Sequence, residues 1–300
     1  MAISPHSIHR CSEVVPISSM QLHDVIFEHE TVYTITISDI DTLAEGIHRR
    51  LRDLGFPIEG RCVEALLFSC ETKRVHMQKR AGTGTSRPFV LEVPGGAVEQ
   101  DDNTLQLASL RELLEESGIC ILGAKPLGHV YFYFWNHKNC TTGPNKWLIK
   151  FALAYAVSGL DVWLFNDRNW DIELKMPKGN SSIIFNRDEV SDVLSINEDA
   201  LKEMILWDPK YPAIAKHPKR LVIQRETLSI LEHIFHSLRC WERPQNDVNR
   251  VLYVEKASDS DIQLKMRGQS LSLARLQQEG LAEMIQGVIK RNFGAHLTCI

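Results

Sequence analysis

The sequence predicts an α/β fold in which a mixed sheet is flanked by helices, with an N-terminal β–α extension and a C-terminal α+β extension. Short segments rich in β-branched and aromatic residues alternate with amphipathic helical segments, which indicates a sheet covered by helices. The alternation lacks strict βαβ regularity, which favours a mixed sheet. A Pro-rich stretch at 208–218 marks a boundary. We therefore expect an N-terminal extension at 1–60, a central domain at 61–210 and a C-terminal extension at 211–300.

The N-terminal extension starts with about twenty residues that look loosely ordered. Residues 31–37 then alternate β-branched and other side chains, which predicts a strand. Ser38 has the character of a helix N-cap, with Asp41 three residues further on. We expect a helix from this cap to about Leu54, ended by Gly55.

The central domain contains short apolar runs bounded by turn residues. These runs predict strands at 63–70, 75–80, 89–93, 127–135, 147–157, 183–185 and 193–196. Helical periodicity predicts helices at 105–117, ended by Gly118, and at 198–206. Residues 158–182 are polar with interspersed aromatic side chains, which is typical of a lid or an excursion.

The C-terminal extension is expected to pack on the central domain or on a partner subunit in a homodimer. A helix at 221–239 repeats large apolar side chains at helical spacing, and this face needs cover. A hairpin-like pair of strands at 251–255 and 262–266 follows, and a helix at about 271–291 closes the chain.

Composition and charge exclude several classes of protein. The formal net charge is -4, so no basic field recruits nucleic acid. The seven cysteines are an odd number, widely scattered and without a C-x-x-C pair, which favours a reducing compartment over a disulfide framework. The N-terminus has no apolar signal-like region and the chain has no long apolar run, so neither secretion nor a membrane partner is expected. A cytoplasmic enzyme or binding protein is the expectation.

The helix at 105–117 carries leucines on one side and three glutamates on the other. Glu112, Glu115 and Glu116 fall within an arc of about 100°. A solvated surface is the commoner fate of such charges. However, glutamates three or four positions apart repel each other by about 0.2–0.5 kcal/mol per pair, and these lie at the negative end of the helix dipole. A bound Mg²⁺ would remove both penalties, because it is held by a few carboxylates, waters and substrate phosphates.

These glutamates belong to a longer pattern that begins at Gly96. After fourteen residues Gly96 is followed by Arg-Glu-Leu-Leu-Glu-Glu-Ser-Gly-Ile, which starts at Arg111. The stretch resembles the Nudix box: Gly, five residues, Glu, seven residues, Arg-Glu-apolar-x-Glu-Glu-x-Gly-apolar. Six fixed positions match, and by average residue usage a chance match is on the order of 10⁻⁷ per register. The loop is one residue longer than in the family. Asp102 stands in place of the early glutamate when counted from Gly96, and Asn103 does when counted back from Arg111.

The resemblance implies a Nudix-like α/β/α sandwich that hydrolyses the diphosphate linkage of a nucleoside diphosphate derivative with Mg²⁺ or Mn²⁺. Glu115 and Glu116 would be metal ligands, and Glu112 a ligand or the general base for the attacking water. Arg111 would hold the loop in shape. Members of the family often take a further carboxylate from a later loop, which makes Glu189 a candidate auxiliary base or ligand, with an acid-rich turn as the alternative. The partner would be a small-molecule diphosphate.

Residues around the box are candidates for substrate binding. Gly95 and Gly96 would let the backbone come close to metal and phosphate. Lys79 and Arg80 could contact phosphate, with ordinary surface cations as the alternative. Tyr133 lies in an aromatic strand and could stack on a base, with a core position as the alternative.

The extra loop residue must be absorbed before Leu105, because the leucine and glutamate registers that follow are intact. Asn103 or Thr104 is expected to cap the helix. Asp102 would then be free to point toward the metal as a shorter substitute for the missing glutamate.

Two other functions stay open. The aromatic strand at 131–135 and the stretch at 163–170 are compatible with an isoprenoid or lipid diphosphate. The irregular loop and the large C-terminal extension are compatible with a Nudix-fold protein that has become a binding module or a non-hydrolytic enzyme.

Overall fold

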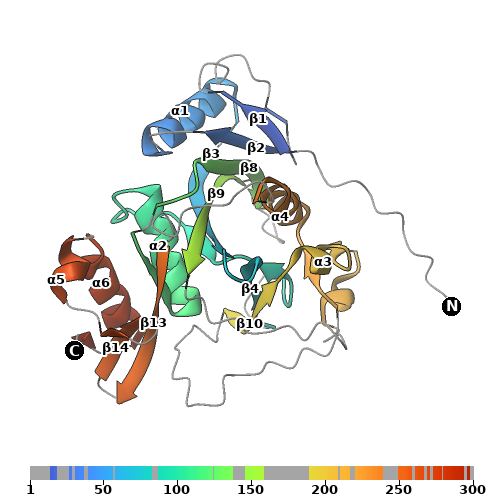
Figure 1. The fold of residues 1–300 in the computed structure, drawn as a ribbon. Coiled ribbons are helices and arrows are strands. Elements are labelled where there is room, and N and C mark those ends of the chain that lie inside the picture. Colours follow the sequence, from blue (N-terminus) through green and yellow to red (C-terminus); the bar gives the residue numbers. More distant parts are fainter. Residues whose placement is uncertain are drawn as a thin grey trace.

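The computed structural model describes residues 14–18, 27–28, 31–36, 40–56, 58–82, 87–123, 125–137, 146–158, 189–208, 210–216, 220–238, 249–258, 261–266, 269–270, 273–278, 280–293 and 296–297. The strands it describes hydrogen-bond into one mixed sheet, and its long central strands are labelled in Figure 1. The main path of the sheet runs β1-β2-β8-β9-β3-β4-β5-β12-β11. The strands of this path are β1 (Val14–Ile17), β2 (Val32–Thr36), β8 (His129–His137), β9 (Lys146–Ser158), β3 (Ile58–Ser69), β4 (Arg74–Arg80), β5 (Leu91–Glu92), β12 (Val222–Ile223) and β11 (Ile205–Leu206).

The two longest strands form the middle of the sheet. β3 and β9 run parallel, and β8 pairs antiparallel with the other edge of β9. β3 also pairs with the short strand β6 (Gly95–Ala97), with Glu64 opposite Gly95 and Val63 opposite Gly96. This register brings the glycine loop against the centre of the sheet. The strands predicted in this region are confirmed, although β5 is shorter than expected and β6 was not predicted.

Helices cover both faces of this sheet. Val63, Ala65 and Leu67 of β3 face one core, which contains apolar residues of α1 (Ile40–Asp53), α2 (Leu105–Ser117), α5 (Leu273–Gln278) and α6 (Ala282–Phe293). Leu66 and Phe68 face the other core, which contains residues of α3 (Glu198–Leu201) and α4 (Arg225–Leu238). The sheet lies between these layers (Figure 1), which confirms the predicted α/β/α sandwich.

The N-terminal extension joins the edge of the sheet. β1 pairs parallel with β2, and β2 pairs antiparallel with β8. α1 buries Leu43, Ala44, Ile47 and Leu51 on one face. The predicted strand and helix are thus confirmed, whereas β1 was not predicted. This four-residue strand includes a proline, which weakens the strand signal and is tolerated at a sheet edge. Ser38, the expected cap of α1, lies outside the described residues.

The helix α2, which follows the loop from Gly96, has the ends that the sequence predicts. Thr104 is its N-cap, and its hydroxyl accepts a hydrogen bond of 3.0 Å from the backbone N–H of Leu107. Gly118 ends the helix in the left-handed region, with φ 66°, a conformation that costs glycine little. The strand β7 (Ile119–Leu122) follows at once and was not predicted.

The C-terminal extension adds strands to the same sheet. β12 pairs parallel with β5 and β11, and β13 (Asn249–Ser258) pairs with β7 and β9. β13 also forms the predicted hairpin with β14 (Asp261–Met266). The N-terminal extension, the central domain and the C-terminal extension all contribute strands to one sheet. The sheet therefore does not divide the chain into domains, and the boundaries expected near 60 and 210 stay predictions.

Several predicted helices differ in length from the structure. The helix expected at 221–239 begins at Arg225, because Val222 and Ile223 form β12. The one expected at 198–206 ends at Leu201, and β11 follows. The last helix is divided into α5 and α6, with Gly280 at φ 69° between them. The expected strand at 183–185 and the expected lid at 158–182 lie outside the described residues, apart from the end of β9. No described helix is long and apolar enough to cross a membrane.

Candidate active site

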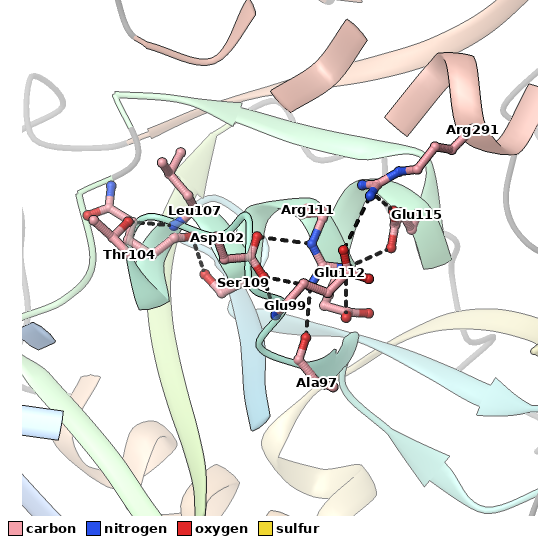
Figure 2. Close-up of polar contacts among 11 residues, drawn as sticks. Ala97, Glu99, Asp102, Thr104, Leu107, Ser109, Arg111, Glu112, Glu115 and Arg291 are labelled. Atoms are coloured by element: carbon pink, nitrogen blue, oxygen red, sulfur yellow. Dashed lines mark hydrogen bonds and ion pairs between the residues drawn. The ribbon is translucent and has the colours of Figure 1, made fainter. Parts of the chain in front are cut away.

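Arg111 of α2 joins the helix to the loop that precedes it. Its Nε and Nη2 donate hydrogen bonds of 3.1 and 2.8 Å to the two carboxylate oxygens of Asp102, and Nη2 also donates to the carbonyl of Ala97 at 2.8 Å. Nη1 donates to Glu112 Oε1 and to Glu115 Oε2, both at 2.9 Å (Figure 2). Burial alone would lower the pKa of Arg111, but the surrounding carboxylates raise it, so the guanidinium stays charged. The geometry suits the loop-holding role that the resemblance implies.

Glu116 lies between α2 and the sheet. Its Oε2 accepts hydrogen bonds from Gln78 Nε2 at 2.6 Å and from the backbone N–H of Gly95 at 2.8 Å. Burial raises the pKa of Glu116 well above its usual range, and the nearby charge of Glu92 raises it further. The carboxylate therefore needs a proton or a cation close by.

Glu112 is buried against the glycine loop. Burial raises its pKa to about 7; the charge of Arg111 opposes this rise, while the charges of Glu115 and Glu189 add to it. A Cβ atom at position 96 would lie 2.6 Å from both carboxylate oxygens of Glu112, so only glycine leaves room for this carboxylate. The buried positions of Glu112 and Glu116 rule out a solvated face for these two residues.

Glu115 is the most exposed of the three glutamates and contacts two arginines. Besides Arg111, it accepts a hydrogen bond on Oε1 from Arg291 Nη2 at 3.3 Å. Arg291 also pairs with Glu99 in the loop, through Nη1 and Oε2 at 3.2 Å. Burial raises the pKa of Glu115, and the charges of Arg111 and Arg291 lower it.

Gly95 is the first residue of β6 and lies opposite Glu64 of the neighbouring strand β3. A Cβ atom there would overlap the carbonyl oxygen of Val63 and lie 2.9 Å from the Cα atom of Glu64. The close approach lets the Gly95 N–H reach Glu116. The glycine is therefore needed for the fold of the box, and its role in substrate binding stays a prediction.

The irregular loop is closed by Asp102. In addition to its pair with Arg111, Asp102 accepts a hydrogen bond on Oδ2 from the backbone N–H of Glu99 at 2.8 Å. Of the two capping candidates Thr104 is the cap, and Asn103 is exposed. The predicted metal role of Asp102 stays a prediction, and its contacts favour holding Arg111 instead.

The two cations predicted to contact phosphate have protein partners. Arg80 Nη1 forms an ion pair of 2.6 Å with Glu92 Oε2. Lys79 is buried, with its ammonium group 5.9 Å from the centre of the Phe89 ring. Phosphate binding by Lys79 and Arg80 stays a prediction.

Tyr133 belongs to a buried polar cluster on the sheet. Its hydroxyl donates to Glu64 Oε1 at 3.0 Å, and Lys150 Nζ donates to the same oxygen at 2.7 Å. Burial and the charge of Glu64 raise the pKa of Tyr133 well above its usual range, so it is a neutral donor. The ring is fully buried, so base stacking by Tyr133 stays a prediction that would require the cluster to open.

Glu189 immediately precedes β10 (Val190–Ile196), which pairs with β4. Its carbonyl accepts a hydrogen bond of 2.7 Å from the N–H of Ala81, and its side chain is exposed. Its charge contributes to the raised pKa of Glu112, so the two carboxylates lie within electrostatic range. This placement is compatible with the auxiliary role predicted for Glu189.

Sequence reasoning missed three residues of this region. Glu92 and Gln78 are opposite each other on β5 and β4. The charge of Glu92 raises the pKa of Glu116, and the side chain of Gln78 donates a hydrogen bond to the Glu116 carboxylate. Arg291 comes from the last described helix. The nearest signal for Glu92 is its position just before the Pro-Gly-Gly sequence, whereas nothing local identifies Arg291.

The donor set fits a hard divalent cation such as Mg²⁺ or Mn²⁺. Glu112, Glu115 and Glu116 supply carboxylate oxygens, which these ions prefer. Within the ranges that the structure describes, no three acidic, histidine or cysteine side chains converge as a ready-made cage. Mg²⁺ does not require one, because it is usually bound by one or two carboxylates, waters and substrate phosphates.

A mixed sheet between two helical layers, with a glycine loop leading into a helix of buried glutamates, defines the class of enzymes that cleave diphosphate linkages with such a loop–helix unit. The sequence model of the NUDIX domain matches residues 60–210 of the chain. The chain belongs to the Nudix family and is a Nudix-type pyrophosphohydrolase.

Solved structures of Nudix proteins resemble the chain at low identity. The NUDIX domain of Shewanella oneidensis NrtR, complexed with ADP ribose, is 16% identical over 62% of this chain and 92% of that one, with a TM-score of 0.36. The MutT protein from Methanosarcina mazei Go1 is 15% identical over 58% and 94%, with a TM-score of 0.34. The C. elegans Ap4A hydrolase is 13% identical over 60% and 98%, with a TM-score of 0.31. No curated protein matches the sequence significantly.

Proposed function

We propose that the protein hydrolyses the diphosphate linkage of a nucleoside diphosphate derivative with the help of Mg²⁺ or Mn²⁺. The observation that carries the proposal is the burial of Glu112 and Glu116 side by side on α2. Burial raises the pKa of each, and the charge of Glu112 contributes to the rise at Glu116. Leaving such carboxylates ionised without a cation is costly.

Different residues of the box would bind the cation and accept the proton of the attacking water. Glu115 and Glu116 would hold the cation, which supplies charge neutralisation at the diphosphate when bound. Glu112 would be a further ligand or would accept the proton of the attacking water; its raised pKa suits a general base near neutral pH. Arg111 keeps the glutamates oriented through its bonds to the loop and the helix.

Polar side chains near the box favour a nucleoside derivative over an isoprenoid or lipid diphosphate. Glu64, Tyr133 and Lys150 form a hydrogen-bonded cluster, and the half-buried Arg87 interacts electrostatically with Tyr133 and Glu92. An apolar chain packed against these groups would remove their charges further from water, which is costly.

The test is a metal-supplemented screen of diphosphate substrates, in which phosphate is measured after the products are treated with phosphatase. We expect Glu115→Gln and Glu116→Gln each to lower activity at least about a hundredfold, because a lost ligand weakens metal stabilisation. Glu232→Gln, which removes an exposed carboxylate from α4, is the matched control. Full activity in EDTA or near-normal rates in both variants would refute the proposal. Absence of turnover with intact metal binding would favour the non-hydrolytic alternative.

A further inference from the structure

The C-terminal helix α6 delivers an arginine to the catalytic box, although it lies outside the segment that the family model matches. α6 packs against α2 and buries Ile285, Val288 and Ile289 in the same core. Arg291, in its last turn, reaches Glu99 in the loop and Glu115 on α2 (Figure 2). The docking of α6 therefore fixes a positive charge beside a carboxylate of the proposed metal site.

Both carboxylate oxygens of Glu115 accept a hydrogen bond from a guanidinium group. Oε2 is bound by Arg111 at 2.9 Å and Oε1 by Arg291 at 3.3 Å. A divalent cation on Glu115 would compete for these oxygens and would stand close to both positive charges. Arg111 is buried and has several further partners, so it has little freedom to leave. The side chain of Arg291 is 47% exposed and can turn into solvent.

We propose that Arg291 is a displaceable counter-ion of the metal site: it holds Glu115 without metal and leaves this carboxylate when a divalent cation binds. The inference rests on the proposed function, because it takes Glu115 to be a metal ligand. By reciprocity, the cation then weakens the contact between α6 and the box by the same factor by which Arg291 weakens cation binding. The C-terminal extension is thereby coupled to metal occupancy.

The test measures Mn²⁺ binding to the full-length protein, from the electron paramagnetic resonance signal of free Mn²⁺. We expect Arg291→Gln to tighten binding about two- to fivefold, the range that corresponds to a partly exposed ion pair. Arg291→Lys, which keeps the charge, should stay close to the parent protein. Lys290→Gln removes the same charge from the neighbouring, exposed position of α6 and should change the affinity little.

A second measurement follows α6 itself. Hydrogen exchange of the last turn of α6 should become faster when Mg²⁺ is added to the parent protein, and this change should be absent in Arg291→Gln. Equal or weaker Mn²⁺ binding by Arg291→Gln, or the same effect in Lys290→Gln, would overturn the inference. So would a misfolded Arg291→Gln protein, since it would show the residue to be a structural tether.

The two proposals can fail separately, because Mn²⁺ binding needs no turnover. Mn²⁺ binding with the expected Arg291 dependence but without diphosphate cleavage would keep the inference and refute hydrolysis. Cleavage with an Mn²⁺ affinity independent of Arg291 would do the reverse. A parent protein that binds no Mn²⁺ would overturn the inference.

Discussion

Replacing Glu112 with glutamine should stabilise the metal-free protein at alkaline pH while impairing catalysis. The carboxyl of Glu112 is buried, and its pKa is raised from 4.5 to about 7, chiefly by burial. The folded protein therefore binds this proton more tightly than the unfolded chain does. Below pH 4.5 the carboxyl is neutral in both states and costs nothing. Stability is lost as the pH rises from 4.5 to about 7, and the loss is complete above that.

The size of the effect follows from the difference between the two pKa values. At 1.36 kcal/mol per pKa unit, a rise from 4.5 to about 7 corresponds to a penalty of about 3 kcal/mol at pH 8. Glutamine resembles the neutral carboxyl in shape and can still accept the hydrogen bond from Arg111. Glu112→Gln should therefore recover up to this amount at pH 8 and nothing at pH 4.5. For a chain of this size this corresponds to a rise in Tm of several degrees.

The assay is thermal unfolding followed by circular dichroism in EDTA, at pH 4.5 and pH 8. Glu232→Gln, an exposed carboxylate on α4, is the control and should change Tm little at either pH. Added Mg²⁺ should reduce the difference in Tm between Glu112→Gln and the parent protein at pH 8. The cation offsets the buried charge of Glu112, and only the parent protein carries that charge. The reasoning would be refuted if Glu112→Gln raised Tm equally at both pH values, or if it lowered Tm at pH 8.

Four further substitutions and one deletion test the site and the fold. Gly95→Ala should destabilise the protein by about 1–3 kcal/mol in urea unfolding, because the added Cβ meets the β3 backbone; no change would contradict this. Thr104→Ala should cost about 1 kcal/mol through the lost cap, and Asn103→Ala markedly less, in the same assay. Asp102→Asn should lower kcat less than the loss of a metal-site glutamate does, since asparagine keeps one acceptor for Arg111; an equal loss would give Asp102 a direct role. Deletion of 219–300 should yield insoluble protein, because it removes β12, β13, α4 and α6 from the sheet and both cores; a soluble, active truncation would show the extension to be an appendage.

Local chemistry made α2 predictable to the residue. Thr104 can satisfy the first backbone N–H groups, and Gly118 adopts a left-handed backbone at little cost, so both ends follow from short-range interactions. The long strands β3 and β9 contain short apolar runs bounded by polar and turn residues, which is the signal from which they were predicted. By contrast, β12 was predicted as the start of a helix. Its two residues are extended because β5 and β11 lie on either side, a fact of packing that the local sequence does not contain.

The candidate site likewise contains residues that the local sequence identifies and residues that only the packing of distant elements brings together. Arg111 and the three glutamates share one helix, so their spacing alone placed them together. Glu92 acts on Glu116 only because β4 and β5 pair in one register, with Gln78 opposite Glu92. The contact between Arg291 and Glu115 spans 176 positions of the sequence and depends on how α6 docks against α2. The residues that sequence reasoning missed are therefore those that reach the box from other elements. Glu92 and Arg291 act through their charge, and Gln78 through a hydrogen bond, on glutamates that the pattern had already identified.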